Sequence, residues 1–185
     1  MRAKGPGESA LLLLDAVALL TDEGVSYAVI GAMAAAVHGV VRASIDADVV
    51  LSADAARLRQ LEKRFLAAGF QTQLRQGDCE DPVPAVLALG DPHRNRVDLL
   101  AGLRGLEPAA FSRALTVPFQ GETLRVIARE DFVAMKIFAG GPKDLTDARA
   151  AIRIAGECLD LVLLRRLAQH YGRSTLEALE EMIKQ

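Results

Sequence analysis

The sequence RASIDADVVL, residues 42–51, contains two acidic residues within an otherwise largely apolar segment. This pattern predicts a β-strand over residues 45–51. Successive side chains on a strand point to opposite faces, so Asp46 and Asp48 share one face. Their carboxylates lie about 7 Å apart along such a strand and repel each other unless a cation lies between them. Hard oxygen ligands with open positions suit Mg²⁺.

A second segment, RNRVDLL at residues 94–100, predicts another strand and carries Asp98 near its apolar end. If this strand pairs beside the first one, Asp98 joins Asp46 and Asp48 on one face. Three carboxylates on two adjacent strands can hold two Mg²⁺ ions, which is the arrangement used for in-line phosphoryl or nucleotidyl transfer. The alternative is that these acidic residues are only solvated strand ends, because Asp-x-Asp alone is a weak pattern.

The dipeptide Gly31–Ala32 lies between a predicted strand and a predicted helix, shortly before the acidic strand. A small residue at such a turn lets a phosphate approach the backbone, and the start of the helix offers free N–H groups. The alternative is a glycine that merely begins a helix.

Apolar periodicity and glycine or proline breaks predict an α/β (α+β) fold, with a mixed β-sheet, flanking helices and a C-terminal helical subdomain. We expect a core over residues 1–128, including an N-terminal helix, and a helical part over residues 129–185 that packs on the core. Residues 1–8 are expected to form a loose terminus, and Ser52 is expected to cap a helix. The predicted helices span residues 8–22, 32–37, 53–68, 129–139, 143–155, 160–171 and 174–184, and the predicted strands span residues 26–31, 45–51, 70–75, 85–89, 94–100, 115–120 and 123–128.

Composition excludes several classes of protein. With 51% apolar residues among 185, the chain can bury a core, and a net charge of −2 excludes nucleic-acid binding driven mainly by overall positive charge. A content of 4% aromatic residues without tryptophan argues against base-stacking platforms. No apolar segment reaches membrane-spanning length. Cys79 and Cys158 form no disulfide framework, so we expect a cytoplasmic protein with no membrane association.

Taken together, these motifs resemble the DNA polymerase β-like nucleotidyltransferases, and within them the AbiEii-type nucleotidyltransferase toxins and their bacterial relatives. The resemblance covers residues 26–155. The motifs that carry it are Tyr27-Ala-Val-Ile-Gly31-Ala32, His38-Gly39, Arg42-x-Ser44-Ile-Asp46-Ala-Asp48, Asp98, Met135-Lys136 and Gly140-Gly-Pro-Lys143-Asp144-Leu-Thr-Asp147.

The resemblance implies an enzyme that uses Mg²⁺ or Mn²⁺ to transfer a nucleoside monophosphate from an NTP to an acceptor hydroxyl. Asp46 and Asp48 would bind metal, Asp98 would be metal-linked or a general base, and Lys136 would meet the triphosphate. An RNA end such as a tRNA 3′ terminus is a reasonable acceptor, and a toxin would have an antitoxin partner. The further nucleotide-binding residues that it implies are Gly31, Ala32, Arg42, Ser44, Lys143, Asp144 and Asp147.

The residues themselves leave alternatives open. Lys136 lies in an apolar helix and needs a partner for its charge, which a phosphate-facing cleft would supply. Asp144 and Asp147 share a helix face, but acidic residues also favour first helical turns in general. Lys143 and Asp147 could pair. Arg42 could contact a phosphate or pair with a carboxylate of the acidic strand.

Two departures from the family pattern keep other functions in view. Ala32 stands where such families have Ser or Gly, and Gly141 stands where a related pattern has Arg. One alternative is a catalytically silent nucleotide- or partner-binding module on the same fold. Another is a small-molecule, antibiotic-like nucleotidyltransferase, which an acceptor groove lined by acids would favour, whereas arginines would favour RNA. His38 and Gly39 are interpreted as a helix C-terminal cap.

Overall fold

The computed structural model describes residues 1–78 and 81–184, and its centre is a seven-stranded mixed sheet. The strands are β1 (Tyr27–Ile30), β2 (Asp46–Leu51), β3 (Gln71–Gln76), β4 (Ala85–Gly90), β5 (Arg96–Ala101), β6 (Leu115–Phe119) and β7 (Glu122–Val126). The helices are α1 (Ser9–Asp22), α2 (Gly31–Val37), α3 (Ala55–Ala67), α4 (Ala109–Arg113), α5 (Arg129–Ala139), α6 (Pro142–Ala155), α7 (Leu161–Tyr171) and α8 (Arg173–Ile183). A short 3₁₀ turn, Gly156–Cys158, follows α6.

The strand order in the sheet is β3-β4-β5-β2-β1-β7-β6. The acidic strand β2 therefore lies near the middle, antiparallel to β1 and parallel to β5. The predicted mixed sheet and the predicted pairing of the two acidic strands are both confirmed.

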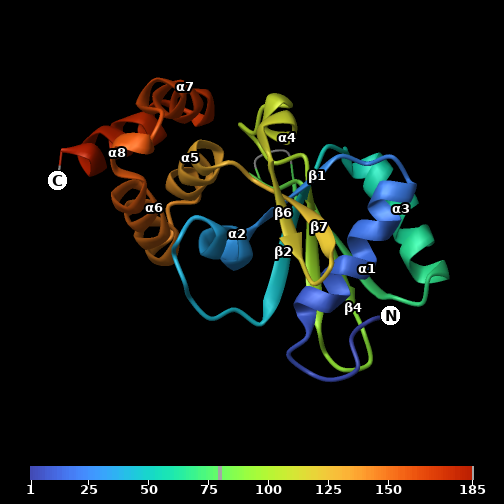
Figure 1. The fold of residues 1–185 in the computed structure, drawn as a ribbon. Coiled ribbons are helices and arrows are strands. Elements are labelled where there is room, and N and C mark those ends of the chain that lie inside the picture. The colour runs from blue at the N-terminus through green and yellow to red at the C-terminus, as the bar shows by residue number, and fades with distance from the viewer. Residues whose placement is uncertain (79–80, 185) are drawn as a thin grey trace.

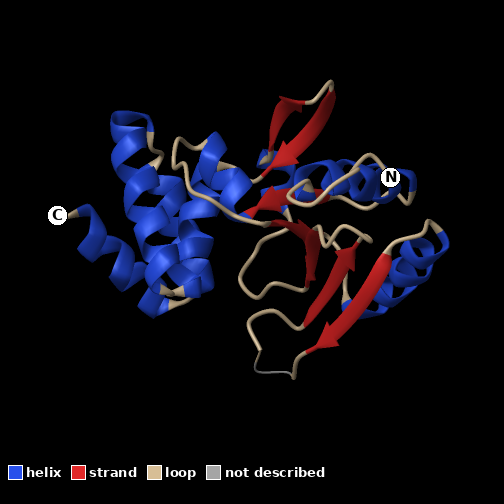
Figure 2. Ribbon diagram, turned by 90° about the horizontal axis from the view of Figure 1, so that it is seen from below, coloured by secondary structure: helices blue, strands red, loops and turns tan. Residues whose placement is uncertain are grey.

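Helices lie on both sides of this sheet. Helix α1 packs on β2 and β5, and α3 packs on β3 and β4 (Figure 1). Helix α2 and the helices that follow β7 lie on the other side. The cluster of C-terminal helices is visible beside the strands in Figure 2. Helix α1 is predominantly apolar, and its leucines Leu12, Leu13 and Leu20 are fully buried against the sheet.

A network of ion pairs ties the C-terminal helices to the loop after β5. Arg113 lies 2.6 Å from Glu107 and 2.6 Å from Asp131 of α5. Arg166 of α7 reaches the same Glu107 at 2.7 Å. These arginines hold the pKa of Glu107 at about 2, with Arg166 the largest influence.

The expectation that residues 1–8 are loose is wrong. The side-chain amide of Asn95 donates to the Gly5 carbonyl at 2.9 Å and accepts from the Glu8 N–H at 2.7 Å. Ala3 is also buried. The contacts come from residues almost ninety positions away, so no local pattern reveals them.

Ser9 extends this anchorage to the acidic strands. Its hydroxyl donates to the Ile45 carbonyl at 2.5 Å and accepts from the Arg96 N–H at 3.1 Å. Ile45 immediately precedes β2 and Arg96 begins β5, so one hydroxyl joins the entries of both strands.

The predicted cap of α3 is also wrong. Asp54, not Ser52, is the N-cap residue, and its carboxylate accepts from the Arg57 N–H at 2.7 Å. Both residue types favour this position, and the helix begins two residues later than predicted. Cys158 is an exposed free thiol, while Cys79 lies outside the described residues. Within residues 1–78 and 81–184, no helix has the length and apolar character needed to cross a bilayer.

Candidate active site

The three carboxylates predicted from the sequence lie on one face of two neighbouring strands. Asp48 of β2 is the register partner of Asp98 of β5, and Asp46 is the partner of Arg96. All three aspartates are half-buried. Because adjacent strands lie about 4.8 Å apart, Asp48 and Asp98 are direct neighbours across the sheet.

Asp48 is crowded by two other carboxylates of like charge. Burial raises the pKa of its carboxyl group, and the charges of Asp98 and Asp46 raise this pKa further. Lys136 and Arg42 act in the opposite direction. A carboxylate held near two others is stabilised by a cation, and Asp48 is in that position.

Asp98 already has a cationic partner. The Arg96 guanidinium donates from Nε to Oδ1 at 2.8 Å and from Nη2 to Oδ2 at 3.0 Å, so both carboxylate oxygens are engaged. This ion pair was not predicted from the sequence. The spacing of two residues on one strand was the signal, because it places Arg96 and Asp98 on the same face.

Gly31 brings the backbone against Asp48. It begins α2 directly after β1 with a φ of +63°, a left-handed conformation that glycine adopts readily. A Cβ atom built at this position would overlap the carboxylate of Asp48. The turn thus requires glycine for its conformation and for the space that Asp48 occupies. Ala32 follows as a buried residue of α2.

Lys136 has the partner that its burial requires, but that partner is internal. Its Nζ lies 2.6 Å from Asp144 and 3.4 Å from Asp147, both on α6, and 5.7 Å from the centre of the Phe132 ring. The Asp147 side chain is only 4% exposed, and it also forms an ion pair with Arg42, whose Nε lies 3.1 Å from Oδ2 of Asp147. Of the alternatives left open by the sequence, a pair of Arg42 with the acidic strand and a pair of Lys143 with Asp147 are therefore not what the structure shows.

Two predicted nucleotide-binding residues lie at the margin. The exposed Ser44 donates its hydroxyl to the backbone carbonyl of Asp46 at 3.1 Å and so shapes the entry to β2. Lys143 is exposed at the start of α6. Neither residue lines the cavity beside Asp48.

A cavity of about 320 Å³ brings the predicted residues of the core and the helical part together. Gly31, Arg42, Asp48, Lys136 and Asp144 line it. Its walls are otherwise mostly apolar, a feature that the sequence reasoning missed, since the contributing segments are distant in the chain. The apolar wall residues are Ile30, Pro82, Val83, Leu100, Leu103, Met135, Phe138 and Ala139.

The donor set fits Mg²⁺ in its chemistry. Asp46 and Asp48 offer carboxylate oxygens without an ion-pair partner in the described part of the chain, and Mg²⁺ is commonly held by one or two carboxylates together with substrate phosphates. Among residues 1–78 and 81–184, no three acidic, histidine or cysteine side chains are grouped closely enough to hold a metal ion as they stand. The third carboxylate of this face, Asp98, is paired with Arg96.

His38 has a structural place. It is the C-cap of α2, is 2% exposed, and its Nε2 lies 2.9 Å from the Ile127 carbonyl. Burial lowers the pKa of its ring, so the neutral form is favoured. This agrees with the interpretation as a helix cap.

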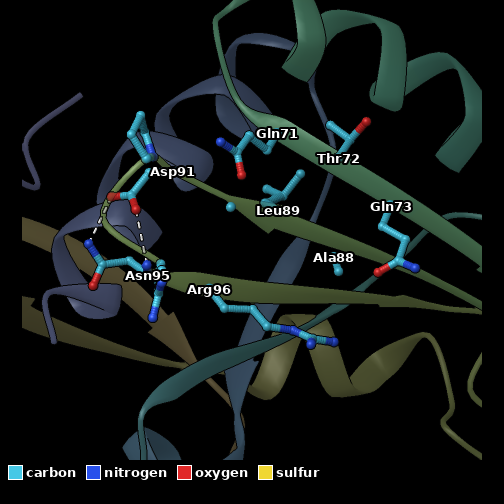
Figure 3. A pocket seen from close by; sticks show the side chains of 11 residues that line it. Gln71, Thr72, Gln73, Ala88, Leu89, Asp91, Asn95 and Arg96 are labelled. Atoms are coloured by element: carbon cyan, nitrogen blue, oxygen red, sulfur yellow. Dashed lines mark hydrogen bonds between the residues drawn. The ribbon is translucent and has the colours of Figure 1, made fainter. Parts of the chain in front are cut away.

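A second hollow, of about 380 Å³, lies over strands β3, β4 and β5 (Figure 3). We call it the β3–β5 groove. Ala88 and Gly90 of β4 form a low floor between Gln71 and Gln73 on β3 and Arg96 on β5. Register places Ala88 beside Asp98, so the floor of the groove borders the strand position of the third carboxylate.

No protein family model matches this sequence, and no curated protein matches it significantly. Several solved structures do match the fold of this chain. The crystal structure of ANT(2″)-Ia in complex with adenylyl-2″-tobramycin matches with a TM-score of 0.57 and 16% identity, over 87% of this chain and 97% of that chain. The lincomycin-bound lincosamide antibiotic adenylyltransferase LnuA matches with a TM-score of 0.50 and 13% identity, over 82% and 99%.

A nucleotidyltransferase-like antigenic protein from Paracoccidioides brasiliensis matches with a TM-score of 0.51 and 16% identity, over 89% of this chain and 82% of that chain. At such identities the likeness shows a shared fold, and it confirms the fold that the sequence motifs imply. The narrower resemblance to AbiEii-type toxins stays a prediction.

Proposed function

Since the chain has the nucleotidyltransferase fold, we propose that it is a Mg²⁺-dependent nucleotidyltransferase that moves a nucleoside monophosphate from an NTP to an acceptor hydroxyl and releases pyrophosphate. The observation that carries this proposal is the pairing of Asp48 with Asp98 on adjacent parallel strands, with Asp46 on the same face. Of the three, Asp48 lines a cavity that Gly31 and Lys136 also line.

Each group has a proposed task. Asp46, Asp48 and Asp98 would hold the metal, which neutralises charge that develops at the α-phosphate. Asp98 is also the candidate to accept the proton of the acceptor hydroxyl. The backbone at Gly31 and Ala32 would approach the triphosphate, because no side chain blocks the turn.

The cations would complete the nucleotide site. Lys136 would contact the triphosphate from α5, with Arg42 and Lys143 nearby. Asp144 and Asp147 are proposed to hold Lys136 and Arg42 in place until the nucleotide enters, because both cations are paired with these carboxylates. The apolar wall of the cavity suits a nucleobase. In this scheme residues 129–185 act as one helical part that covers the core.

For the acceptor, we propose an RNA 3′ end, such as that of tRNA, as the first candidate, and an antitoxin protein as the partner if expression is toxic. The support is the resemblance of residues 26–155 to the toxin family. ANT(2″)-Ia and LnuA, whose structures hold a modified or intact antibiotic, make a small hydroxylated molecule the next candidate.

A catalytically silent nucleotide- or partner-binding module is the second candidate function. It is favoured by two observations: Lys136 is neutralised by Asp144 and Asp147, and Asp98 is neutralised by Arg96. A protein of this kind would bind nucleotide or partner without turning over.

Calorimetric titration with each NTP and Mg²⁺ tests the proposal, followed by transfer of α-labelled nucleotide to total RNA and to small acceptors. The variants are Asp46→Asn and Asp48→Asn, and the matched control is Asp22→Asn, an exposed carboxylate at the end of α1. We expect Mg²⁺-dependent binding and transfer in the wild type and the control, and loss of both in the two site variants. Binding without transfer supports the silent nucleotide-binding module. No binding by the wild type refutes the enzyme and leaves a silent module whose partner is to be sought.

A further inference from the structure

Arg96 faces two features at once. Its guanidinium holds both oxygens of Asp98, and its side chain lines the β3–β5 groove (Figure 3). The Arg96 side chain is 42% exposed, whereas that of Asp98 is 17% exposed. The arginine can therefore be reached from solvent while it covers the carboxylate.

Charges of both signs line the groove: Arg94 and Arg96 are cationic, and Asp91 is anionic. Asp91 is the one acidic residue among the described residues that line it, and its carboxylate already accepts from the N–H groups of His93 and Asn95 and from the Asn95 amide. Arg94 is exposed and has no ion-pair partner within residues 1–78 and 81–184. The remaining polar side chains, Gln71, Thr72 and Gln73, are uncharged.

We propose that Arg96 is a positioning residue with two partners: it holds Asp98 in the free protein, and it passes to a phosphate or carboxylate group of an acceptor bound in the β3–β5 groove, which frees Asp98 to complete the metal site. This inference rests on the proposed function and adds the acceptor class, a hydroxyl compound that carries an anionic group.

The chemistry of the guanidinium supports this exchange. Its planar fork binds carboxylates and phosphates with the same two-point geometry, so an acceptor anion can replace Asp98 without loss of hydrogen bonds. The Arg96 side chain is 42% exposed, so water and an incoming anion can reach it and compensate for the separation of the pair. The groove has no unpaired carboxylate for a polycationic acceptor among its described residues, which sets it apart from an acid-lined antibiotic site.

Binding of Mn²⁺ to the full chain without NTP, followed by electron paramagnetic resonance, tests the hold on Asp98. Arg96→Gln should bind Mn²⁺ about five-fold more tightly than the wild type, which is what the loss of an ion pair of ordinary strength allows. Arg94→Gln removes the same charge from the same groove without breaking a pair, and should change the affinity less than two-fold. Arg96→Lys keeps the charge but not the two-point contact with Asp98. It should increase the Mn²⁺ affinity more than Arg94→Gln does. Equal effects of Arg94→Gln and Arg96→Gln would overturn the proposal.

Side-chain and amide NMR spectra test the second partner. Glycerol 3-phosphate should shift the Arg96 Nε–H signal and the amides of Ala88 and Gly90 in the wild type, glycerol should not, and Arg96→Gln should lose the amide shifts. Shifts that persist in Arg96→Gln, or that lie at Gly31 instead, would overturn the acceptor assignment. A wild type that binds no Mn²⁺ counts against the proposed function, and the phosphate spectra still decide the role of Arg96.

Discussion

Replacing Gly31 by alanine is expected to damage stability and metal binding together. The residue has a φ of +63°, and an added Cβ would overlap the carboxylate of Asp48. The substitution therefore has two separable costs, one from the backbone conformation and one from displacing the aspartate.

The magnitudes follow from this geometry. The left-handed conformation costs a non-glycine residue about 1–2 kcal/mol. Forcing the Asp48 side chain aside adds about 1–3 kcal/mol, which is typical of overpacked positions. We expect Gly31→Ala to lose about 2–5 kcal/mol of unfolding free energy and to weaken Mn²⁺ binding about ten-fold, as changes in residues that orient metal ligands do.

Gly24 provides the matched control. It has a φ of +65° at the end of α1, and nothing lies within 4 Å of its would-be Cβ. Gly24→Ala should therefore lose only the backbone part, about 1–2 kcal/mol, and should leave Mn²⁺ affinity unchanged. Urea unfolding followed by circular dichroism gives the free energies, and paramagnetic resonance gives the affinities. If the two variants lose equal stability and both keep Mn²⁺ affinity, the close approach of Gly31 to Asp48 has no consequence and the reasoning is refuted.

Three further predictions follow from the charges. Asp48→Asn should raise the unfolding free energy of the metal-free protein by about 1 kcal/mol at pH 7, because it removes a crowded carboxylate whose pKa is raised. Urea titrations should show this gain shrinking as the pH falls toward the ordinary value of 3.8, because the folded protein takes up this proton at a higher pH than the unfolded chain does; a gain that does not change with pH would contradict this. The pKa of His38 is lowered, so the unfolded state binds the extra proton first and the stability advantage of the wild type over His38→Gln should fall as the pH drops below about 6.5; an advantage that is constant from pH 7.5 to 5 would contradict this. Glu107→Gln should lose about 1 kcal/mol at pH 7 and little at pH 2, since the pKa of this carboxyl group is about 2 and its contribution is present above the unfolded value of 4.5; equal losses at both pH values in thermal unfolding would contradict the network with Arg113 and Arg166.

Local patterns in the sequence predict the elements of this fold well, because each element carries its own signal. The alternation in residues 45–51 identifies β2 and the face that Asp46 and Asp48 share. Glycines and prolines punctuate the helices after β7, and Pro142 begins α6 as its fixed φ favours. The boundaries that moved, such as the start of α3, depend on which of two capping residues the chain uses.

The site could be predicted only in part. Placing Asp98 beside Asp48 requires a parallel pairing of strands fifty residues apart, which the family resemblance supplied and local periodicity could not. The ion pairs of Lys136 with α6 and of Arg42 with Asp147 join segments whose approach no sequence pattern encodes. The pair of Arg96 with Asp98 was within reach of period-two reasoning, but a charged residue at a strand edge is more often solvated.

The hydroxyl of Ser9 has a practical meaning for anyone who handles this protein. It joins the entries of β2 and β5, and the segment before it is held by Asn95, so the N-terminal residues act as a brace for the alignment of Asp48 with Asp98. An affinity tag fused directly before Met1, or removal of N-terminal residues, would disturb the hydrogen bonds that hold this segment against β2 and β5. A tag placed after α8 does not touch these N-terminal hydrogen bonds and is the better choice for every assay described above.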